Sequence, residues 1–367
     1  MRFVVSLLAL RPGRVGGTEQ HIRGLLAAFP SVLGGDELIV LAGTEAAASV
    51  ETPGLARAVL DRSSRGLIAA RGLEAFTPWR DRPLERVIDA LRPDAIFFPQ
   101  ISFFPKALRT PAVVMVGDVQ HMVLPHNFSR LDRIFRASIY PYSFGKARLL
   151  LPVSERTRRD LETVAGVPAD KLRVVRPGSV FRGATRRSCS QAPPIEGRYL
   201  YFPAATNRHK GHADLFRAFA ELPAQETPLS LVLTGERTGY WSQLETTATR
   251  LGIRSRVLHL GYVAPEVVDS LYGHAEAVVF PSRFEGFGLP VAEAASFGAK
   301  VIASNLDVFD ENGTEGVLRI DFADSQQLRV ALESPQRASL AAGVWTWEDA
   351  AAATLVALRD AATAGPV

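Results

Sequence analysis

The stretch "AVVFPSRFEGFGLPVAEAASFG", Ala277–Gly298, decides the fold. It opens with a short apolar run, Ala277–Phe280, of the kind that forms a buried strand. A loop follows, because one proline and two glycines in the next residues disfavour both helix and strand. Pro290 suits the first position of a helix, which we expect over Val291–Ser296 with Gly298 just beyond its end. A strand, a glycine-containing loop and a helix in this order form the building unit of parallel α/β sheets.

Two glutamates flank the junction between this loop and its helix. Glu285 lies in the loop, and Glu293 lies in the first turns of the helix. The free backbone N–H groups of Gly288 and Leu289 point out of the helix start, and such a start binds phosphate. A carboxylate on either side can accept hydrogen bonds from sugar hydroxyls, so a nucleotide sugar fits the stretch. The plainer interpretation is that Glu293 complements the helix dipole and that Glu285 is a solvated loop residue.

Short apolar runs alternate with helical patterns along the rest of the chain. The first set of expected strands is Phe3–Leu8, Leu38–Leu41, Ala95–Phe98, Ala112–Val116 and Leu149–Val153. The second set is Arg198–Phe202, Leu229–Thr234, Arg256–Leu260, Ala277–Phe280 and Lys300–Ala303. Helical patterns between them include Thr18–Phe29, Ala213–Leu222 and Pro265–His274. This alternation predicts an α/β protein with two Rossmann-like, doubly wound parallel-sheet domains that face a cleft, with ligands beyond the carboxyl ends of the strands.

A segment rich in proline, glycine, serine and arginine separates the two sets of strands. It covers Arg176–Gly197 and has no helical or strand period, so we expect an interdomain linker there. The expected organisation is an N-terminal domain over residues 1–176, a linker over 177–197 and a C-terminal domain over 198–346. An alanine-rich helix, Trp347–Ala362, follows the second domain.

The composition excludes several classes of protein. The 367 residues carry a net charge of only +4, which does not indicate nucleic-acid binding. The single cysteine, Cys189, cannot form an intrachain disulfide, which fits a reducing, cytoplasmic compartment. No apolar run reaches the roughly 20 residues that span a bilayer. The start, "MRFVVSLLAL", is expected to be a buried strand rather than a signal peptide, because no small-residue cleavage site follows it.

The segment "AATNRHKGHADLFRAF" places positive charge at the start of a helix. Arg208 and Lys210 follow the expected strand and immediately precede the helical pattern. Positive charge at this position opposes the helix dipole, and a bound anion such as a leaving diphosphate would resolve the conflict. The chain contains no Asp-x-Asp pair to hold a metal on a diphosphate, so Lys210 takes that part and we expect neither metal nor cofactor. A solvated surface lysine is the alternative.

Two loops of the first domain also carry candidate residues. In "RVGGTEQHIRGLL", Gly16 and Gly17 permit close approach of a ligand to the backbone, and Glu19 is a candidate on the acceptor side. The glycine pair is not G-x-G-x-x-G and does not predict NAD. In "MVGDVQHMVLP", Asp118 and His121 are candidates for a base or a sugar ligand. An ordinary turn and a structural Asp–His pair are the alternatives.

Basic and aromatic side chains are interleaved over Arg130–Asp160. The basic residues are Arg130, Arg133, Arg136, Lys146, Arg148, Arg156, Arg158 and Arg159, and the aromatic ones are Phe135, Tyr140, Tyr142 and Phe144. This pattern is compatible with contact with an anionic membrane surface or with a lipid-diphosphate acceptor. Solvated helix faces are the alternative interpretation.

These segments resemble the retaining glycosyltransferases of family 4, which have the two-domain GT-B fold. The most specific part is "GYVAPEVVDSLYGHAEAVVFPSRFEGFGLPVAEAASFGAKVIASN", which holds the E-x7-E pair Glu285 and Glu293. "YFPAATNRHKGHADLFRAFAEL" is similar to the segment that supplies a phosphate-binding lysine, and "GGTEQHIRGLL" to the glycine loop of the first domain. "LPVSERTRRDLETVAGVPADKLRVVRPG" resembles the segment before the linker, and "WTWEDAAAATLVALRDA" a helix that often returns to the first domain.

The resemblance implies a role for each matched residue. Glu285 would bind hydroxyls of the donor sugar, Glu293 the ribose diol, and Lys210, with Arg208, the leaving diphosphate. The residues implied in catalysis are Lys210, Glu285, Asp118 and Arg208. Those implied in donor binding are Gly16, Gly17, Lys210, Tyr262, Val263, Phe287, Gly288, Leu289 and Glu293, with Tyr262 and Val263 near the base. His121 and Glu19 are the candidates on the acceptor side.

Two positions depart from the family pattern. Thr206 stands four residues before Lys210, where many members have an arginine. Gly117 stands before Asp118, where the family usually has a histidine that contacts the donor sugar. A smaller or deoxygenated sugar, such as a 6-deoxyhexose, is one physical reason for the glycine, and lost activity is another.

The implied function is transfer, with retention, of a hexose or 6-deoxyhexose from a GDP- or UDP-linked donor. The implied acceptor is a glycan or a lipid-linked glycan in bacterial surface polysaccharide synthesis. The alternatives are a nucleotide-sugar epimerase on the same fold and a non-catalytic nucleotide-sugar-binding protein. We expect a cytoplasmic protein with a peripheral contact to the inner membrane and no nucleic-acid partner.

Overall fold

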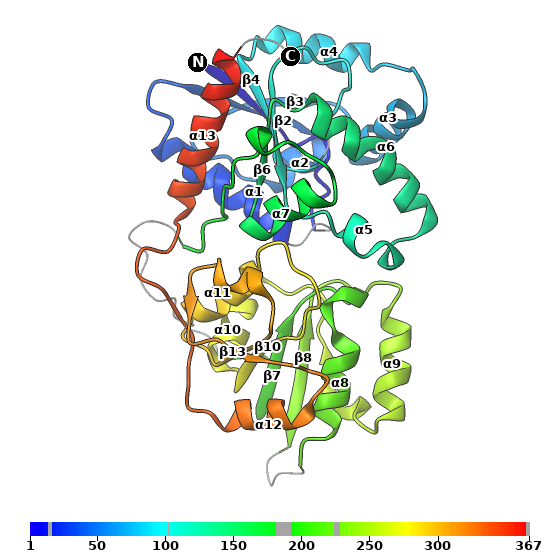
Figure 1. Ribbon diagram of the computed structural model, residues 1–367, viewed down its shortest axis with the longest axis vertical. Helices are drawn as coiled ribbons and strands as arrows, with labels where there is room; N and C mark the ends of the chain where they lie inside the picture. Colours follow the sequence, from blue (N-terminus) through cyan, green and yellow to red (C-terminus); the bar gives the residue numbers. More distant parts are fainter. Residues whose placement is uncertain (14–16, 102, 181–191, 224–227, 365–367) are drawn as a thin grey trace. The chain divides into compact units, whose positions relative to one another are not determined.

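The computed structural model describes residues 1–13, 17–101, 103–180, 192–223 and 228–364 (Figure 1). The chain divides into two compact units. The first unit comprises Met1–Arg182 together with Trp345–Val367, and the second comprises Gly183–Val344. Each unit contains its own six-stranded sheet.

The sheet of the first unit has the strand order β3-β2-β1-β4-β5-β6, with every pair parallel. Its strands are β1 (Arg2–Ser6), β2 (Glu37–Gly43), β3 (Ala56–Leu60), β4 (Ala95–Phe98), β5 (Ala112–Val116) and β6 (Leu149–Pro152). Val4 of β1 lies between Ile39 of β2 and Ile96 of β4. The strands β4, β5 and β6 are fully buried, which explains why their sequences are continuous apolar runs. The order reverses between β1 and β4, which is the switch point of a doubly wound sheet.

Helices connect these strands, and most begin at a residue whose side chain caps the first turn. They are α1 (Gly17–Ala28), α2 (Thr44–Ser49), α3 (Ser64–Phe76), α4 (Arg82–Leu91), α5 (Gln120–Val123), α6 (Arg130–Lys146), α7 (Glu155–Thr163) and α13 (Trp347–Thr363). The capping side chains are Ser63, Asp81, Ser129, Ser154 and Thr346. Each accepts a hydrogen bond from an otherwise unsatisfied N–H group of its helix.

Helix α13 belongs to the first unit, although the whole second unit precedes it in the chain. It packs along α1, and both appear side by side in Figure 1. The approach is so close that a Cβ atom on Gly24 would lie 2.4 Å from the Trp347 ring. The His21 ring meets the same tryptophan edge-on at 5.6 Å, and Arg359 forms an ion pair with Asp36 at 2.7 Å. Glycine at position 24 is therefore required for this packing.

The sheet of the second unit has the order β13-β11-β10-β7-β8-β9, again parallel throughout. Its strands are β7 (Arg198–Pro203), β8 (Leu229–Thr234), β9 (Val257–His259), β10 (Ala277–Phe280), β11 (Val301–Ser304) and β13 (Leu318–Ile320). Its helices are α8 (His212–Ala220), α9 (Trp241–Arg250), α10 (Pro265–His274), α11 (Leu289–Ser296) and α12 (Ser325–Glu333). Two short strands, β12 (Thr314–Glu315) and β14 (Ser339–Leu340), form a separate antiparallel pair. The switch point of this sheet lies between β7 and β10.

The predicted fold class, two doubly wound parallel sheets, is confirmed. The strands β4, β5, β8 and β10 have the predicted bounds. The strands β3 and β13, which lie at sheet edges, were not predicted, because each is only partly buried and lacks a long apolar run. One helix start was also wrong: α11 begins at Leu289, so Pro290 occupies the second helical position rather than the first. Proline is tolerated there because that N–H group has no partner within the helix.

Candidate functional site

The loops at the switch point of the second sheet carry the strongest candidates. β7 and β10 are hydrogen-bonded neighbours, so the loops that follow their carboxyl ends start side by side. The first loop leads through Lys210 into α8, and the second leads through Glu285 into α11. Ligands of doubly wound sheets bind where the strand order reverses, so this is the expected place for a ligand.

Lys210 and Glu285 form an ion pair. The Lys210 Nζ atom donates to both carboxylate oxygens of Glu285, at 2.7 and 2.9 Å. The two side chains are only 21% and 15% exposed, so solvent screens the pair weakly. The structure therefore brings together two residues that are 75 positions apart in the sequence and that were predicted to serve one donor.

The two loops are fastened to each other by their backbones as well. The Arg283 N–H group donates to the His209 carbonyl oxygen at 2.7 Å, and the Arg283 guanidinium forms an ion pair with Asp214 at 2.6 Å. Gly211 has a φ of +74°, and a Cβ atom on it would lie 2.0 Å from the Pro281 carbonyl oxygen. Glycine is required at position 211 for two reasons, its backbone conformation and this contact. Lys210 is thus held beside the second loop before any ligand binds.

Burial and charge set the protonation of this pair and its neighbour. Burial would raise the pKa of Glu285, but the charge and hydrogen bonds of Lys210 hold that pKa below its ordinary value. Burial, assisted by Lys210, lowers the pKa of His209 to about 4. At neutral pH the site therefore holds a carboxylate and a neutral imidazole.

The start of α11 supplies the second predicted carboxylate. Gly288 caps the helix with a φ of +88°, and a Cβ atom there would lie 2.5 Å from the Phe309 ring. Phe287 and Leu289 are buried, so only their backbone can meet a ligand. Glu293 is half-buried one turn further on, and the Tyr272 hydroxyl donates to its Oε2 atom at 3.0 Å. The first turn of the helix thus presents backbone N–H groups and an oriented carboxylate.

Arg208 has contacts that lead away from Lys210. Its guanidinium lies 4.4 Å from the centre of the Tyr240 ring and donates to Gln243 of α9 at 2.8 Å. Thr206 is buried and accepts a hydrogen bond from the Thr238 N–H group at 2.8 Å. Threonine at this family position therefore joins the loops after β7 and β8.

The loop after β9 carries the residues assigned to the base. Gly261 has a φ of +72°, and its carbonyl oxygen accepts from the Gly235 N–H group at 2.8 Å. This bond joins the loops that follow β8 and β9. Tyr262 is 60% exposed and Val263 is half-buried, so the tyrosine presents most of its ring to solvent.

In the first unit, Asp118 and His121 follow β5. The Asp118 Oδ1 atom accepts from the Gln120 N–H group at 2.9 Å, which shapes the start of α5. His121 is buried, and its ring meets the Tyr140 ring edge-on at 4.5 Å. Burial and the nearby Arg136 lower the pKa of His121 to about 4, so its ring is neutral at pH 7.

Sequence reasoning missed one arginine beside this histidine. Arg71 of α3 lies 5.4 Å from the Phe135 ring, and its Nε atom is buried without a hydrogen-bond partner in the described structure. Burial lowers the pKa of Arg71 to about 10, and Arg136 contributes to the shift. Arg136 in turn donates to the Tyr140 hydroxyl at 2.5 Å. We call Arg71, His121, Arg136 and Tyr140 the Tyr140 cluster. The sequence signal that could have identified Arg71 is its position as the single arginine in the largely apolar stretch "LIAARGLEAF".

The glycine loop is only partly covered by the structure. Gly16 lies outside the described residues, and Gly17 is exposed at the first position of α1. Glu19 accepts from the Gly13 N–H group at 2.7 Å and forms an ion pair with Arg23 at 2.6 Å. Glu19 thus fixes the local turn with both carboxylate oxygens.

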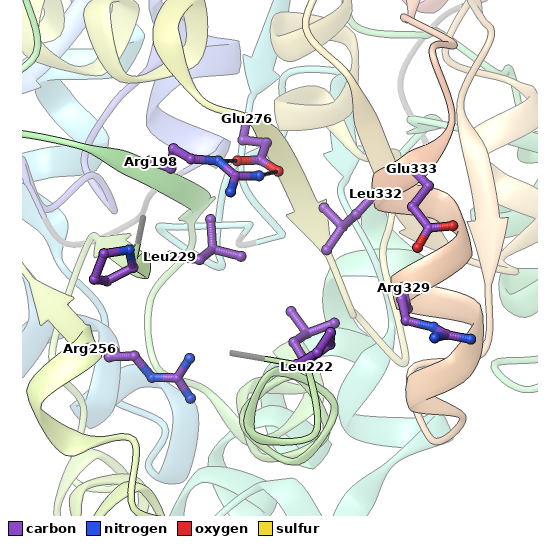
Figure 2. Close-up of a pocket in the computed structure, with 10 residues that line it drawn as sticks. Arg198, Leu222, Leu229, Arg256, Glu276, Arg329, Leu332 and Glu333 are labelled. Carbon is purple, nitrogen blue, oxygen red and sulfur yellow. Dashed lines mark hydrogen bonds and ion pairs between the residues drawn. The ribbon is translucent and has the colours of Figure 1, made fainter. Parts of the chain in front are cut away.

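A cavity of about 490 Å³ lies at the opposite edge of the second sheet (Figure 2). It opens at the amino ends of β7 and β8, where Arg198 and Glu276 form an ion pair at 2.6 Å. Arg256 and Arg329 line it from two sides in Figure 2. Because the loops with Lys210 and Glu285 leave the carboxyl ends, this cavity is separate from the candidate site.

Within the described ranges, no group of three or more His, Cys, Asp or Glu side chains could hold a metal ion. No helix in that same part of the chain has the length and apolar character needed to cross a membrane.

Comparison with known protein families gives one match for each unit. Residues 15–179 match the model described as "Glycosyltransferase Family 4". Residues 189–334 match the model described as "Glycosyl transferases group 1". The second match includes both Lys210 and the Glu285–Glu293 pair.

Curated relatives match part of the chain. "O-antigen chain mannosyltransferase B" of Escherichia coli is 30% identical over 234 residues, 59% of this chain and 59% of the relative. "O-antigen chain mannosyltransferase RfbU" of Salmonella typhimurium is 23% identical over 221 residues, 60% of each chain. The matched part therefore spans about three fifths of the length of these relatives.

Solved structures match nearly the whole chain. Anabaena HepE in complex with UDP and glucose has a TM-score of 0.65 at 20% identity, covering 98% of this chain and 95% of that one. WaaG, described as a glycosyltransferase involved in lipopolysaccharide biosynthesis, has a TM-score of 0.61 at 16% identity, covering 98% and 95%. At these identities the likeness concerns the fold.

Proposed function

The chain belongs to the glycosyltransferases of family 4 and group 1, and from this premise we propose that it transfers a hexose or 6-deoxyhexose from a nucleoside-diphosphate sugar. The acceptor in this proposal is a glycan or a lipid-linked glycan. The observation that carries the proposal is the Lys210–Glu285 pair at the switch point, one loop away from the phosphate-binding start of α11.

In the proposed reaction, the donor diphosphate takes over the Lys210 ammonium from Glu285. Lys210 and the N–H groups at the start of α11 then stabilise the negative charge that grows as the bond between C1 and the diphosphate breaks. Such fixed donors contribute about 3–4 kcal/mol to the transition state. No metal ion is needed for this step, because Lys210 supplies the neutralising charge.

Glu285, once released by Lys210, accepts hydrogen bonds from hydroxyls of the donor sugar. Glu293 accepts from the ribose diol, with the Tyr272 hydroxyl holding the carboxylate in place. The two glutamates therefore hold the two ends of one donor and are not an acid/base pair.

Retention follows from attack on the face that the diphosphate leaves. The acceptor hydroxyl forms the new bond to C1 while the bond to the diphosphate breaks, and a diphosphate oxygen takes the hydroxyl proton. We include this step because retention is typical of the family. It requires no protein base, which accords with the low pKa of His121, a weak base, and with the hydrogen bond that Asp118 accepts at the start of α5.

The donor sugar is proposed from the relatives and from Gly117. Two matched proteins are O-antigen chain mannosyltransferases, so mannose on a GDP or UDP carrier is the first candidate. Gly117 lacks the side chain that usually contacts the donor sugar, so a 6-deoxyhexose is the second candidate. Both sugars fit a part in bacterial surface polysaccharide synthesis.

The acceptor is proposed to carry a phosphate or diphosphate group. In the Tyr140 cluster, Arg71 and Arg136 contact aromatic rings, and among the described residues neither forms an ion pair with a carboxylate. A buried guanidinium without an anion is unfavourable, and an anionic group on the acceptor would relieve this. A lipid-linked acceptor would bring such a group and would be presented at the cytoplasmic face of a membrane.

A binding panel followed by a transfer assay tests this function. The full chain is melted with UDP, GDP, dTDP and their sugars, and the true donor raises the melting temperature by mass action. Transfer is then measured by mass spectrometry with and without lipid-linked acceptors. Sugar transfer that requires an acceptor supports the proposal. Epimerised sugar without an acceptor would instead indicate an epimerase, and binding without any turnover would indicate a non-catalytic protein.

A further inference from the structure

Exposed apolar side chains gather on one face of the first unit. They come from the end of α3, from the turn after it and from the start of α6, and they are Leu73, Phe76, Trp79, Leu131 and Ile134. Leu131 is 80% exposed and Ile134 is 57% exposed. We call these five residues the α3–α6 face. Large apolar side chains of this exposure, gathered rather than scattered, mark an interaction surface.

The α3–α6 face is continuous because the two helices pack against each other. The Phe76 and Phe135 rings are 6.3 Å apart, and the Ser138 hydroxyl of α6 donates to the Ala75 carbonyl of α3 at 2.7 Å. Leu131 lies one helical turn before Phe135, on the same side of α6. The ring contact therefore joins the exposed residues of α3 to those of α6, and both helices lie on the same side of the unit in Figure 1.

The rim of this face is positively charged. Arg130 and Arg133 are exposed on the first turns of α6, and no described carboxylate forms an ion pair with either of them. The carboxylate in the same turn, Asp132, accepts a hydrogen bond from the Ser129 hydroxyl at 2.6 Å. An apolar patch edged with unpaired arginines is complementary to anionic lipid headgroups above an apolar layer.

A second copy of the chain fits this face less well. In a two-fold contact the same patch meets itself, so both copies would bring Arg130 and Arg133 into one interface. Like charges brought together in this way oppose association. Phosphate headgroups, in contrast, neutralise the arginines while the aliphatic side chains enter the interface.

We propose that the α3–α6 face docks the protein on an anionic lipid surface, with Leu131 and Ile134 inserted among the headgroups and Arg130 and Arg133 on lipid phosphates. This inference deepens the proposed function and rests on it for its purpose, because docking would bring the first unit to a lipid-linked acceptor. Within the basic segment 130–160, only the first turns of α6 take part. The aromatic rings further along, Tyr140 and Phe144, are buried.

Vesicle flotation of the full chain tests the proposal. Vesicles of phosphatidylcholine are compared with vesicles that contain about 30 mol% phosphatidylglycerol, at about 0.1 and 0.5 M salt. Binding should require phosphatidylglycerol and should weaken at high salt. The double variant Leu131→Ser/Ile134→Ser should bind about tenfold more weakly. The double variant Arg130→Gln/Arg133→Gln should also lose about tenfold or more.

The matched control is Val164→Ser/Val356→Ser, which removes exposed apolar side chains elsewhere on the same unit and should change nothing. Equal binding to both kinds of vesicle, or no binding to either, would overturn the proposal. Equal losses of vesicle binding in the α6 variants and in the control variant would also overturn it. The same holds if the protein forms a dimer that dissociates only in the variant Leu131→Ser/Ile134→Ser. All variants should keep the melting-temperature rise with the donor, so failure here leaves the proposed sugar transfer intact.

Discussion

The carboxyl edge of the second sheet and the Tyr140 cluster of the first unit differ in how their charges are satisfied. In the second unit, Lys210 pairs with Glu285 and Arg283 pairs with Asp214. In the Tyr140 cluster, Arg71 and Arg136 contact aromatic rings and, within the described residues, no carboxylate pairs with them. In the proposed function, the donor would therefore displace the ion pair between Lys210 and Glu285, whereas an anionic acceptor would meet the Tyr140 cluster without displacing an ion pair.

This difference has a physical consequence for selectivity. A ligand that displaces the Lys210–Glu285 pair gains only the difference between its own contacts and the ion pair that it replaces. Binding there therefore favours a ligand whose groups match both Lys210 and Glu285. At the Tyr140 cluster no existing ion pair would be lost, so the gain is the attraction between arginine and anion minus the cost of desolvating the anion. We therefore expect the Lys210–Glu285 site to favour one chemical class of donor, and the Tyr140 cluster to favour an acceptor that carries negative charge.

The largest effect on turnover is expected when the Lys210 ammonium group is removed. Lys210→Met should lower turnover about 10²- to 10³-fold, because the charge on the leaving diphosphate loses its main neutralising group. Turnover is measured at saturating donor. Arg250→Met, at an exposed arginine of α9, is the control and should change turnover little.

The substitution Lys210→Met also leaves the Glu285 carboxylate buried without its cationic partner, so the melting temperature of this variant should fall. The double variant Lys210→Met/Glu285→Gln should regain the melting temperature and not the turnover. Turnover within a few-fold of the unchanged protein in Lys210→Met would contradict the assignment.

A smaller effect is expected when Arg71 is removed from the Tyr140 cluster. Arg71→Met keeps the packing on Phe135 and removes a buried cation, so the melting temperature should hold or rise. The KM for an anionic acceptor should rise about tenfold or more while donor affinity is unchanged. Arg86→Met, an exposed arginine of α4, is the control. A parallel loss of donor affinity, or no change in acceptor KM, would remove the anion-binding role of the cluster.

The smallest effect concerns pH and a buried histidine of the second unit, His212. Burial lowers the pKa of His212 to about 3, so its ring stays neutral in the folded protein while the unfolded chain takes up a proton below about 6.5. The free energy of unfolding should therefore fall as pH drops from about 6.5 towards 3. His212→Phe, which can pack on the adjacent Phe202 ring, should flatten this fall by up to about 1.4 kcal/mol per pH unit.

Urea unfolding at several pH values between 5 and 7.5 measures this slope. His126→Gln, a substitution at an exposed ring, serves as the control and should leave the slope as it is. A slope that stays unchanged in His212→Phe would show that this histidine does not contribute to acid sensitivity.

The sequence alone was sufficient for the parallel sheets, because β4, β5, β8 and β10 are buried on both faces and appear as continuous apolar runs. The edge strands β3 and β13 lack that signal. The loops with Lys210 and Glu285 were also found, since proline and glycine mark them. The ion pair between Lys210 and Glu285 was not predicted. It depends on β7 lying beside β10, and no local sequence pattern indicates that strand order.

Arg71 shows a second limit of sequence reasoning. A single arginine in a helix is usually a solvated residue, and only the packing of α3 on α6 buries it beside Tyr140 and Arg136. His121 shows the converse. It was singled out for its chemistry, and the structure buries its ring, neutral, in an aromatic environment.

The position of α13 has a consequence for how the protein is made. The first unit includes residues from Trp345 onward, so its packing against α1 cannot form until the ribosome has synthesised the whole second unit. At about 5–20 residues per second, translation of Gly183–Val344 takes roughly 10–30 s. During that time the surface of α1 around Gly24, which α13 later covers, lacks its partner helix.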